Sequence, residues 1–88
     1  MWEYSHVLPE EKKEKEFIEK LGKRIKALRL SKELRQNEVA YRCNFDKSSY
    51  NNIEAGKRNI TITTLLKISN ALQIDIIEFF SKDEEDSE

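Results

Sequence analysis

The sequence contains few of the residues from which catalytic and metal-binding sites are usually built. Its 88 residues include one cysteine, one histidine, one proline and two glycines. The lone Cys43 excludes an internal disulfide and fits a reducing cytoplasm. His6 is the only histidine and lies in a terminal segment, and Cys43 has no Cys or His neighbour at metal-ligand spacing. No glycine-rich phosphate loop is present. We therefore expect no metal, no cofactor and no enzyme activity, because no set of catalytic roles can be assigned.

Long apolar runs are absent as well. No run of about 18 apolar residues exists, so the sequence predicts no membrane span. The N-terminal segment MWEYSHVLPEEKK has neither the basic nor the apolar region of a signal peptide. A chain of this length allows one small domain, and 38% hydrophobic residues suffice for a core if the chain is mostly helical. These features predict a cytoplasmic, single-domain, all-α protein.

The net charge of −1 conceals an uneven distribution of charge along the chain. Residues 1–19 carry a net −3, residues 20–60 a net +7 and residues 61–88 a net −5. A positive middle is typical of a surface that binds phosphates, although a solvated basic helix surface gives the same count. The charge therefore favours a nucleic-acid partner only if a binding motif lies in the same stretch.

That positive stretch contains RQNEVAYRCNFDKSSYNNIEAGKR, which has the pattern of two short helices joined by a tight turn. We expect the helices over residues 36–43 and 47–55. Asn44 tolerates the left-handed backbone of the turn, and Asp46 is a good N-cap for the second helix. Gly56 then stands where a left-handed residue commonly closes a helix.

The second of these helices has two different faces. Tyr50 and Ile53, at positions i and i+3, are its only residues that point to a core. The opposite face carries short polar or basic side chains and no acidic ones: Lys47, Ser48, Asn51 and Asn52. A helix held from behind and polar in front can read base edges in the major groove.

The rest of the chain predicts three more helices around this pair. The first begins near Pro9 and extends to about Leu30, with an apolar stripe of Phe17, Ile18, Leu21, Ile25 and Leu28. The other two cover residues 62–72 and 76–80. We expect a domain over residues 9–81, preceded by an arm of residues 1–8 and followed by an acidic tail of residues 82–88.

Four segments, LGKRIKALR, RQNEVA, SSYNNIEAGKRN and TLLKISNALQIDIIEFF, resemble in order and spacing the phage-repressor (Cro/lambda-repressor, XRE-type) helix-turn-helix family. The resemblance covers residues 21–80, and RNITITTLLKI further resembles the restriction–modification controller subgroup. Arg35 replaces the usual Ser or Thr cap, and Ile60 stands where the family often has Pro. The resemblance implies a five-helix lambda-repressor-like DNA-binding domain, here with an extended first helix.

The resemblance also implies which residues contact double-stranded DNA. The positions that meet base edges are Lys47, Ser48, Ser49 and Asn52. Asn52 is chemically suited to adenine and Lys47 to guanine or phosphate, whereas the serines are permissive. The positions expected to contact phosphates are Gln36, Asn51, Lys57, Arg58 and Asn59. For the last three, an ordinary polar loop is the alternative.

Arg29 falls on the apolar stripe of the first helix, where an unpaired charge would be costly. The resemblance implies an internal ion pair with Glu54; the alternative is that Arg29 extends to solvent. Ile77 stands where the family usually has a polar residue. With Phe80 it would form an apolar patch that predicts a homodimer, unless the arm or the tail folds back over it.

The sequence thus predicts a sequence-specific DNA-binding transcriptional regulator, a repressor or an autoregulatory controller. It would act as a homodimer on a palindromic operator. The alternative is an antitoxin or anti-repressor whose arm or acidic tail captures another protein, as the extra aromatic residues of the arm suggest.

Overall fold

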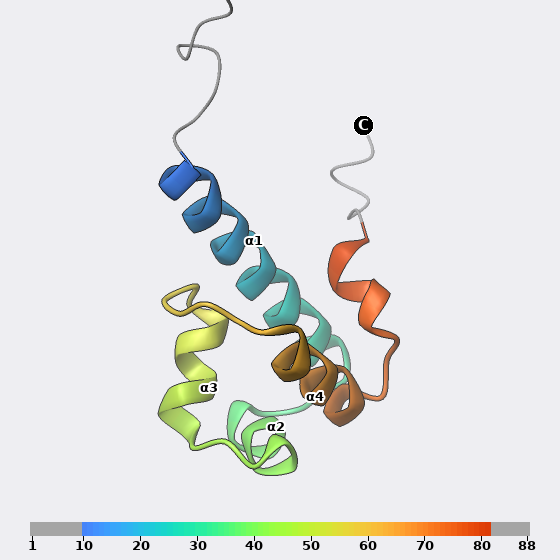
Figure 1. Ribbon diagram of the computed structural model, residues 1–88. Helices are drawn as coiled ribbons and strands as arrows, with labels where there is room; N and C mark the ends of the chain where they lie inside the picture. Colours follow the sequence, from blue (N-terminus) through green and yellow to red (C-terminus); the bar gives the residue numbers. More distant parts are fainter. Residues whose placement is uncertain (1–9, 82–88) are drawn as a thin grey trace, which may run out of the picture.

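The computed structural model describes residues 10–81 as a bundle of one long and four short helices (Figure 1). In chain order these are α1 (Glu10–Ser31), α2 (Gln36–Cys43), α3 (Lys47–Glu54), α4 (Ile62–Leu72) and the 3₁₀ helix η2 (Ile76–Phe80). No strand occurs among these residues. The prediction of an all-α fold with a long first helix is confirmed.

The last element differs from the expected α-helix, since η2 is a 3₁₀ helix. Its five residues lie between the Asp75 cap and the extended Ser81, which leaves room mainly for short i to i+3 bonds such as Glu78 N–H to Asp75 O at 2.9 Å. The 3₁₀ form is common in segments this short. The predicted arm (residues 1–8) and acidic tail (residues 82–88) lie outside the described residues.

The helices are arranged so that α3 is supported on one side and open on the other. α1 packs against α3 and η2, whereas α2 packs against α3 and α4, and α4 also contacts η2. In Figure 1, α1 runs diagonally behind the domain while α2 and α3 lie together at one end. α3 is therefore held by two neighbours, α1 and α2, and its remaining face is open.

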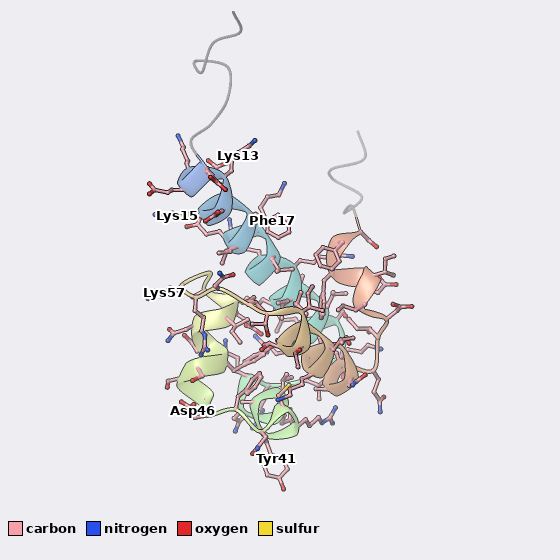
Figure 2. All side chains as sticks on the ribbon, viewed as in Figure 1. Lys13, Lys15, Phe17, Tyr41, Asp46 and Lys57 are labelled. Carbon is pink, nitrogen blue, oxygen red and sulfur yellow. The ribbon has the colours of Figure 1, made fainter. Side chains whose placement is uncertain are left out.

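The core forms where these helices meet. Its fully buried side chains come from every α-helix and include Ile25, Val39, Tyr50, Ile68 and Leu72. Burial of α1 begins only at Leu21. The expectation that Phe17 belongs to the buried stripe is wrong, because its side chain is 56% exposed on the part of α1 that projects past its neighbours (Figure 2).

Local backbone geometry follows the sequence closely at the turn and caps. Asn44 has φ 61° and ψ 39° in the left-handed region, and Gly56 has φ 72°. Asp46 and Thr61 cap α3 and α4 through their side chains. Arg35 makes no side-chain cap bond, as expected, but Glu38 accepts the Arg35 backbone N–H at 2.7 Å. This bond supplies half of a capping box and offsets the poor cap.

Gly22 lies where α1 crosses the end of α3 at close range. A Cβ atom on Gly22 would lie 2.6 Å from the backbone oxygen of Glu54 and 2.7 Å from that of Ile53. Both contacts are to backbone atoms, so no side chain can rotate away. The absence of a side chain at Gly22 therefore sets the distance between α1 and α3.

We predict that Gly22→Ala destabilises the fold although alanine is the better helix former. Helix propensity alone favours alanine by about 1 kcal/mol, whereas forcing two packed backbones apart costs roughly 1–3 kcal/mol. Thermal and urea unfolding should show a net loss. The exposed Ala27→Gly in the same helix measures the propensity term separately. A Gly22→Ala protein that is more stable than the wild type would contradict the close crossing.

Candidate nucleic-acid interface

The outer face of α3 gathers most of the residues expected to contact DNA. Tyr50 and Ile53 are buried against the core, as predicted from their spacing. Four polar side chains of the same helix are exposed: Lys47, Ser48, Asn51 and Asn52. Ser49 is half-buried. None of these five residues is acidic, so the face suits the negatively charged surface of a nucleic acid.

Behind this face lies a buried ion pair between Arg29 and Glu54. Arg29 Nε donates to Glu54 Oε2 at 2.7 Å, and Nη2 donates to Oε1 at 3.1 Å. Arg29 Nη1 also donates to the Leu34 carbonyl at 2.7 Å. Both charged residues are only 6% exposed. The bidentate contact between Arg29 and Glu54 therefore joins α1 to the end of α3. The third bond of Arg29 joins α1 to the α1–α2 loop.

The ion pair continues outward to the surface through two amides. Gln36 Nε2 donates to Glu54 Oε1 at 2.9 Å, and Asn51 Nδ2 donates to Gln36 Oε1 at 3.0 Å. Because a carboxylate can only accept, Glu54 fixes the orientation of Gln36, which in turn fixes Asn51. Each amide keeps one N–H that these two bonds do not use, and phosphate oxygens accept such donors.

The hydrogen bonds of this cluster favour the charged forms of Arg29 and Glu54. Burial by itself raises the pKa of Glu54, but the hydrogen bonds from Arg29 and Gln36 outweigh it and hold that pKa below the ordinary 4.5. The hydrogen bond to Glu54 raises the pKa of Arg29. Burial, together with the neighbouring Glu54 carboxylate, raises the pKa of Tyr50. Glu54 and Arg29 are thus both charged at neutral pH.

The two ends of α3 differ in charge. At its N-terminus the exposed Asp46 accepts hydrogen bonds from Ser48 and Ser49. Past its C-terminus the loop exposes Lys57, Arg58 and Asn59. Figure 2 shows Asp46 and Lys57 at opposite ends of the helix. Asn59 Oδ1 accepts the Ile60 N–H at 2.9 Å. This bond uses only the oxygen of the Asn59 amide and none of its N–H groups.

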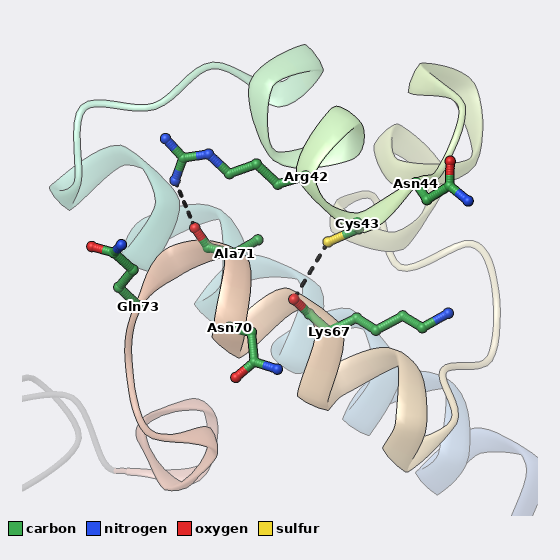
Figure 3. Close-up of a pocket in the computed structure, with 7 residues that line it drawn as sticks. All are labelled: Arg42, Cys43, Asn44, Lys67, Asn70, Ala71 and Gln73. Carbon is green, nitrogen blue, oxygen red and sulfur yellow. Dashed lines mark hydrogen bonds between the residues drawn. The ribbon is translucent and has the colours of Figure 1, made fainter.

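A separate groove of about 430 Å³ lies between α2 and α4 (Figure 3). Its walls are joined by Arg42 Nη1 donating to the Ala71 carbonyl at 2.8 Å and by Cys43 Sγ contacting the Lys67 carbonyl at 3.6 Å. Burial raises the pKa of Cys43, so its thiol stays protonated. None of the residues expected to contact DNA lines this groove, and its hydrogen bonds fasten α2 to α4.

Sequence reasoning missed two features of this surface. It treated Ser48 and Ser49 as permissive base contacts, whereas both hydroxyls are bound to Asp46. The D-x-S-S spacing at a helix start was the available signal. It also assigned Gln36 and Asn51 separately, although they are bonded to each other.

Among residues 10–81, no group of His, Cys, Asp and Glu could hold a metal ion. No described helix is long and apolar enough to cross a membrane.

We predict that Glu54→Gln destabilises the protein at neutral pH by roughly 3–5 kcal/mol, because it leaves the Arg29 charge buried without its partner. The loss should shrink in acid. Since the folded-state pKa of Glu54 lies below 4.5, its contribution is complete above that pH and disappears as the pH falls through the lowered value. Urea unfolding between pH 7 and pH 3 measures this.

The exposed Glu16→Gln is the matched control and should change stability little at any of these pH values. A gap between the wild type and Glu54→Gln that stays constant from pH 7 to pH 3 would contradict the proposed charge state of Glu54.

The comparisons with known proteins agree with this geometry. Residues 25–79 match the helix-turn-helix family model, which begins in the middle of α1. The control protein C.MunI of a Mycoplasma species is 40% identical over 63 residues, covering 70% of this chain and 85% of that protein. The control protein C.BamHI of Bacillus amyloliquefaciens is 32% identical over 62 residues, covering 66% and 76%.

Solved structures give the same result. The restriction–modification controller protein C.AhdI from Aeromonas hydrophila has a TM-score of 0.69 at 35% identity, covering 72% of this chain and 96% of that one. Wild-type C.Esp1396I, also a restriction–modification controller protein, has a TM-score of 0.67 at 35% identity, covering 72% and 83%. The chain belongs to the helix-turn-helix family of DNA-binding regulators, and restriction–modification controller proteins are among its relatives.

Proposed function

We propose that the protein is a sequence-specific transcriptional regulator of the controller type, which binds a palindromic DNA site as a homodimer. The observation that carries this proposal is the polar face of α3, free of acidic residues and held in place by the buried Arg29–Glu54 pair. Relatives described as control proteins and as restriction–modification controllers support it. We also propose that the protein is located in the cytoplasm and has no catalytic role.

In this function α3 enters the major groove and its exposed side chains meet base edges. Asn52 can make a bidentate contact with adenine, and Lys47 can contact guanine or a phosphate. The start of α2, with Gln36, faces one DNA backbone, where free helix N–H groups also favour a phosphate. Lys57, Arg58 and Asn59 contact the backbone beyond the other end of α3. Base contacts supply specificity and phosphate contacts supply position.

We predict that Asn52→Ala and Arg58→Ala weaken binding in different ways. Asn52→Ala should cost about 1–3 kcal/mol on the preferred site and relax its sequence preference at one base pair. Arg58→Ala should weaken binding to specific and random DNA alike. It should also reduce the slope of log affinity against log salt concentration by about the amount that one phosphate contact contributes. Gel shifts at several salt concentrations, on a site selected from random DNA, separate the two effects. Equal effects on both kinds of DNA would overturn the base-reading role of Asn52.

The homodimer is proposed to form through η2. Phe79 is directed into the core and is 4% exposed, whereas Ile77 is 62% and Phe80 50% exposed. Two large apolar side chains on one short helix form a patch of the kind that marks a partner surface. A twofold axis through η2 would bury the same patch on both copies. It would place two recognition helices roughly 34 Å apart, one turn of DNA.

We predict that Ile77→Glu converts a dimer into a folded monomer, because it places a charge in the middle of the proposed interface. Light scattering at micromolar concentration measures the mass, and circular dichroism shows whether each domain remains folded. Tyr41→Glu is the control: Tyr41 is 86% exposed on α2 and points away from the domain in Figure 2. A monomeric wild type, or a dimer that tolerates Ile77→Glu, would refute the interface.

The alternative function, an antitoxin or anti-repressor, depends on residues 1–8 and 82–88, which lie outside the described residues. No feature of residues 10–81 favours it. Failure of the protein to select any sequence from random DNA would return this alternative to first place.

A further inference from the structure

The Asp46 carboxylate at the N-terminal end of α3 is hydrogen-bonded to two neighbouring serines. Ser48 Oγ lies 2.7 Å from Asp46 Oδ2, and Ser49 Oγ lies 2.7 Å from Asp46 Oδ1. Asp46 Oδ2 also accepts the Ser49 backbone N–H at 3.3 Å. Each carboxylate oxygen thus holds one serine hydroxyl. Asp46, Ser48 and Ser49 are called the acceptor corner below.

The positions of the hydroxyl protons in the acceptor corner follow from charge. The hydroxyls of Ser49 and then Ser48 lower the pKa of Asp46 to about 2, so the carboxylate has no proton at neutral pH. It can only accept, and both serines must therefore donate to it. A serine hydroxyl has a single proton. Toward any third group, Ser48 and Ser49 can offer only lone pairs.

This arrangement restricts which base edges the corner can meet. In the major groove, the hydrogen-bond donors are the N4 amino group of cytosine and the N6 amino group of adenine. Guanine O6 and N7, adenine N7 and thymine O4 are acceptors. An acceptor atom would have to compete with a carboxylate for the serine proton, and a charge-assisted hydrogen bond is roughly twice as strong as a neutral one.

We infer that the acceptor corner reads the exocyclic amino groups of cytosine or adenine, and that Asp46 is the specificity-determining residue that imposes this choice on Ser48 and Ser49. The inference deepens the proposed DNA-binding function and rests on it. Serine alone is permissive, because its hydroxyl can turn to donate or accept. Asp46 removes this freedom without having to touch the DNA.

The charge of Asp46 also affects how α3 is seated. An exposed carboxylate repels phosphate oxygens, so placing the acceptor corner next to the DNA backbone is unfavourable. Placing it within the groove, near the amino groups of the bases, is favourable. Lys47, next to Asp46 in the chain, carries the opposite charge and offers donors only. The first turn of α3 therefore presents donor and acceptor side chains with fixed roles, next to each other.

The experiment uses the full chain and a DNA site selected from random sequence. Ser48→Ala and Ser49→Ala first identify the base pairs whose selection depends on each serine. At those pairs, adenine is replaced by purine or cytosine by pyrimidin-2-one, which removes only the amino group. As a control, adenine is replaced by 7-deazaadenine, which removes only the N7 acceptor.

Removal of the amino group should weaken wild-type binding about tenfold, the usual scale of one base contact, and should cost much less in the matching serine variant. The 7-deaza change should not depend on the serine. A serine-dependent loss on removal of N7, or an equal loss on removal of the amino group with and without the serine, would overturn the inference.

Asp46→Asn tests the part assigned to Asp46. Asparagine is as good an N-cap as aspartate, so α3 should stay folded, but its amide has one acceptor and one donor. The hydroxyl proton of one serine is then free to donate to the DNA. Binding should therefore depend less on the amino group at the base pair that this serine contacts. Asp75→Asn, the same change at the cap of η2, should leave selection unaltered.

An Asp46→Asn protein that remains folded and keeps the full amino-group dependence would show that Asp46 does not set the specificity. Failure of the wild type to select any sequence would instead overturn the proposed function itself, so the two failures can be told apart.

Discussion

The orientation of α3 depends on Glu54. It is the last residue of α3, it is buried, and its two oxygens accept from Arg29 of α1 and from Gln36 of α2. A buried carboxylate is tolerated only when its oxygens are paired. Any rotation of α3 about its axis would break these bonds while keeping the charge buried. The ion pair therefore selects one orientation of α3, and apolar packing of Tyr50 and Ile53 alone would be less selective.

The features that could be predicted from sequence are those that depend on neighbours along the chain. Asn44 and Asp46 have the expected turn and cap roles because these are decided within three residues. The inward positions of α3 follow from helical spacing. Family resemblance supplied the pairing of Arg29 with Glu54, which are 25 residues apart and carry no local signal.

The features that could not be predicted depend on where other helices end. Phe17 fits the apolar stripe by spacing, but the elements packed on α1 do not extend far enough to cover it. Gly22 lies in mid-helix, and nothing in its neighbours along the chain indicates that the backbone of α3 passes beside it. The bond between Gln36 and Asn51 likewise requires two helices to be placed first. Helical periodicity gives the direction of a side chain, and only the fold gives its neighbour.

α1 contacts both α3, whose exposed polar face is proposed to bind DNA, and η2, which carries the proposed dimer surface. On one side it meets α3 through Gly22 and the Arg29–Glu54 pair. On the other side Arg24 Nε donates to the Glu78 carbonyl of η2 at 3.0 Å. Both contacts lie within two turns of α1, and a helix of that length is stiff. Among the described helices, α1 is thus the one that packs against both η2 and α3, and the route through α4 and α2 supports the same arrangement. A homodimer built on η2 would therefore transmit the geometry of its interface directly to the spacing of its two recognition helices, and a palindrome of only one spacing would fit both.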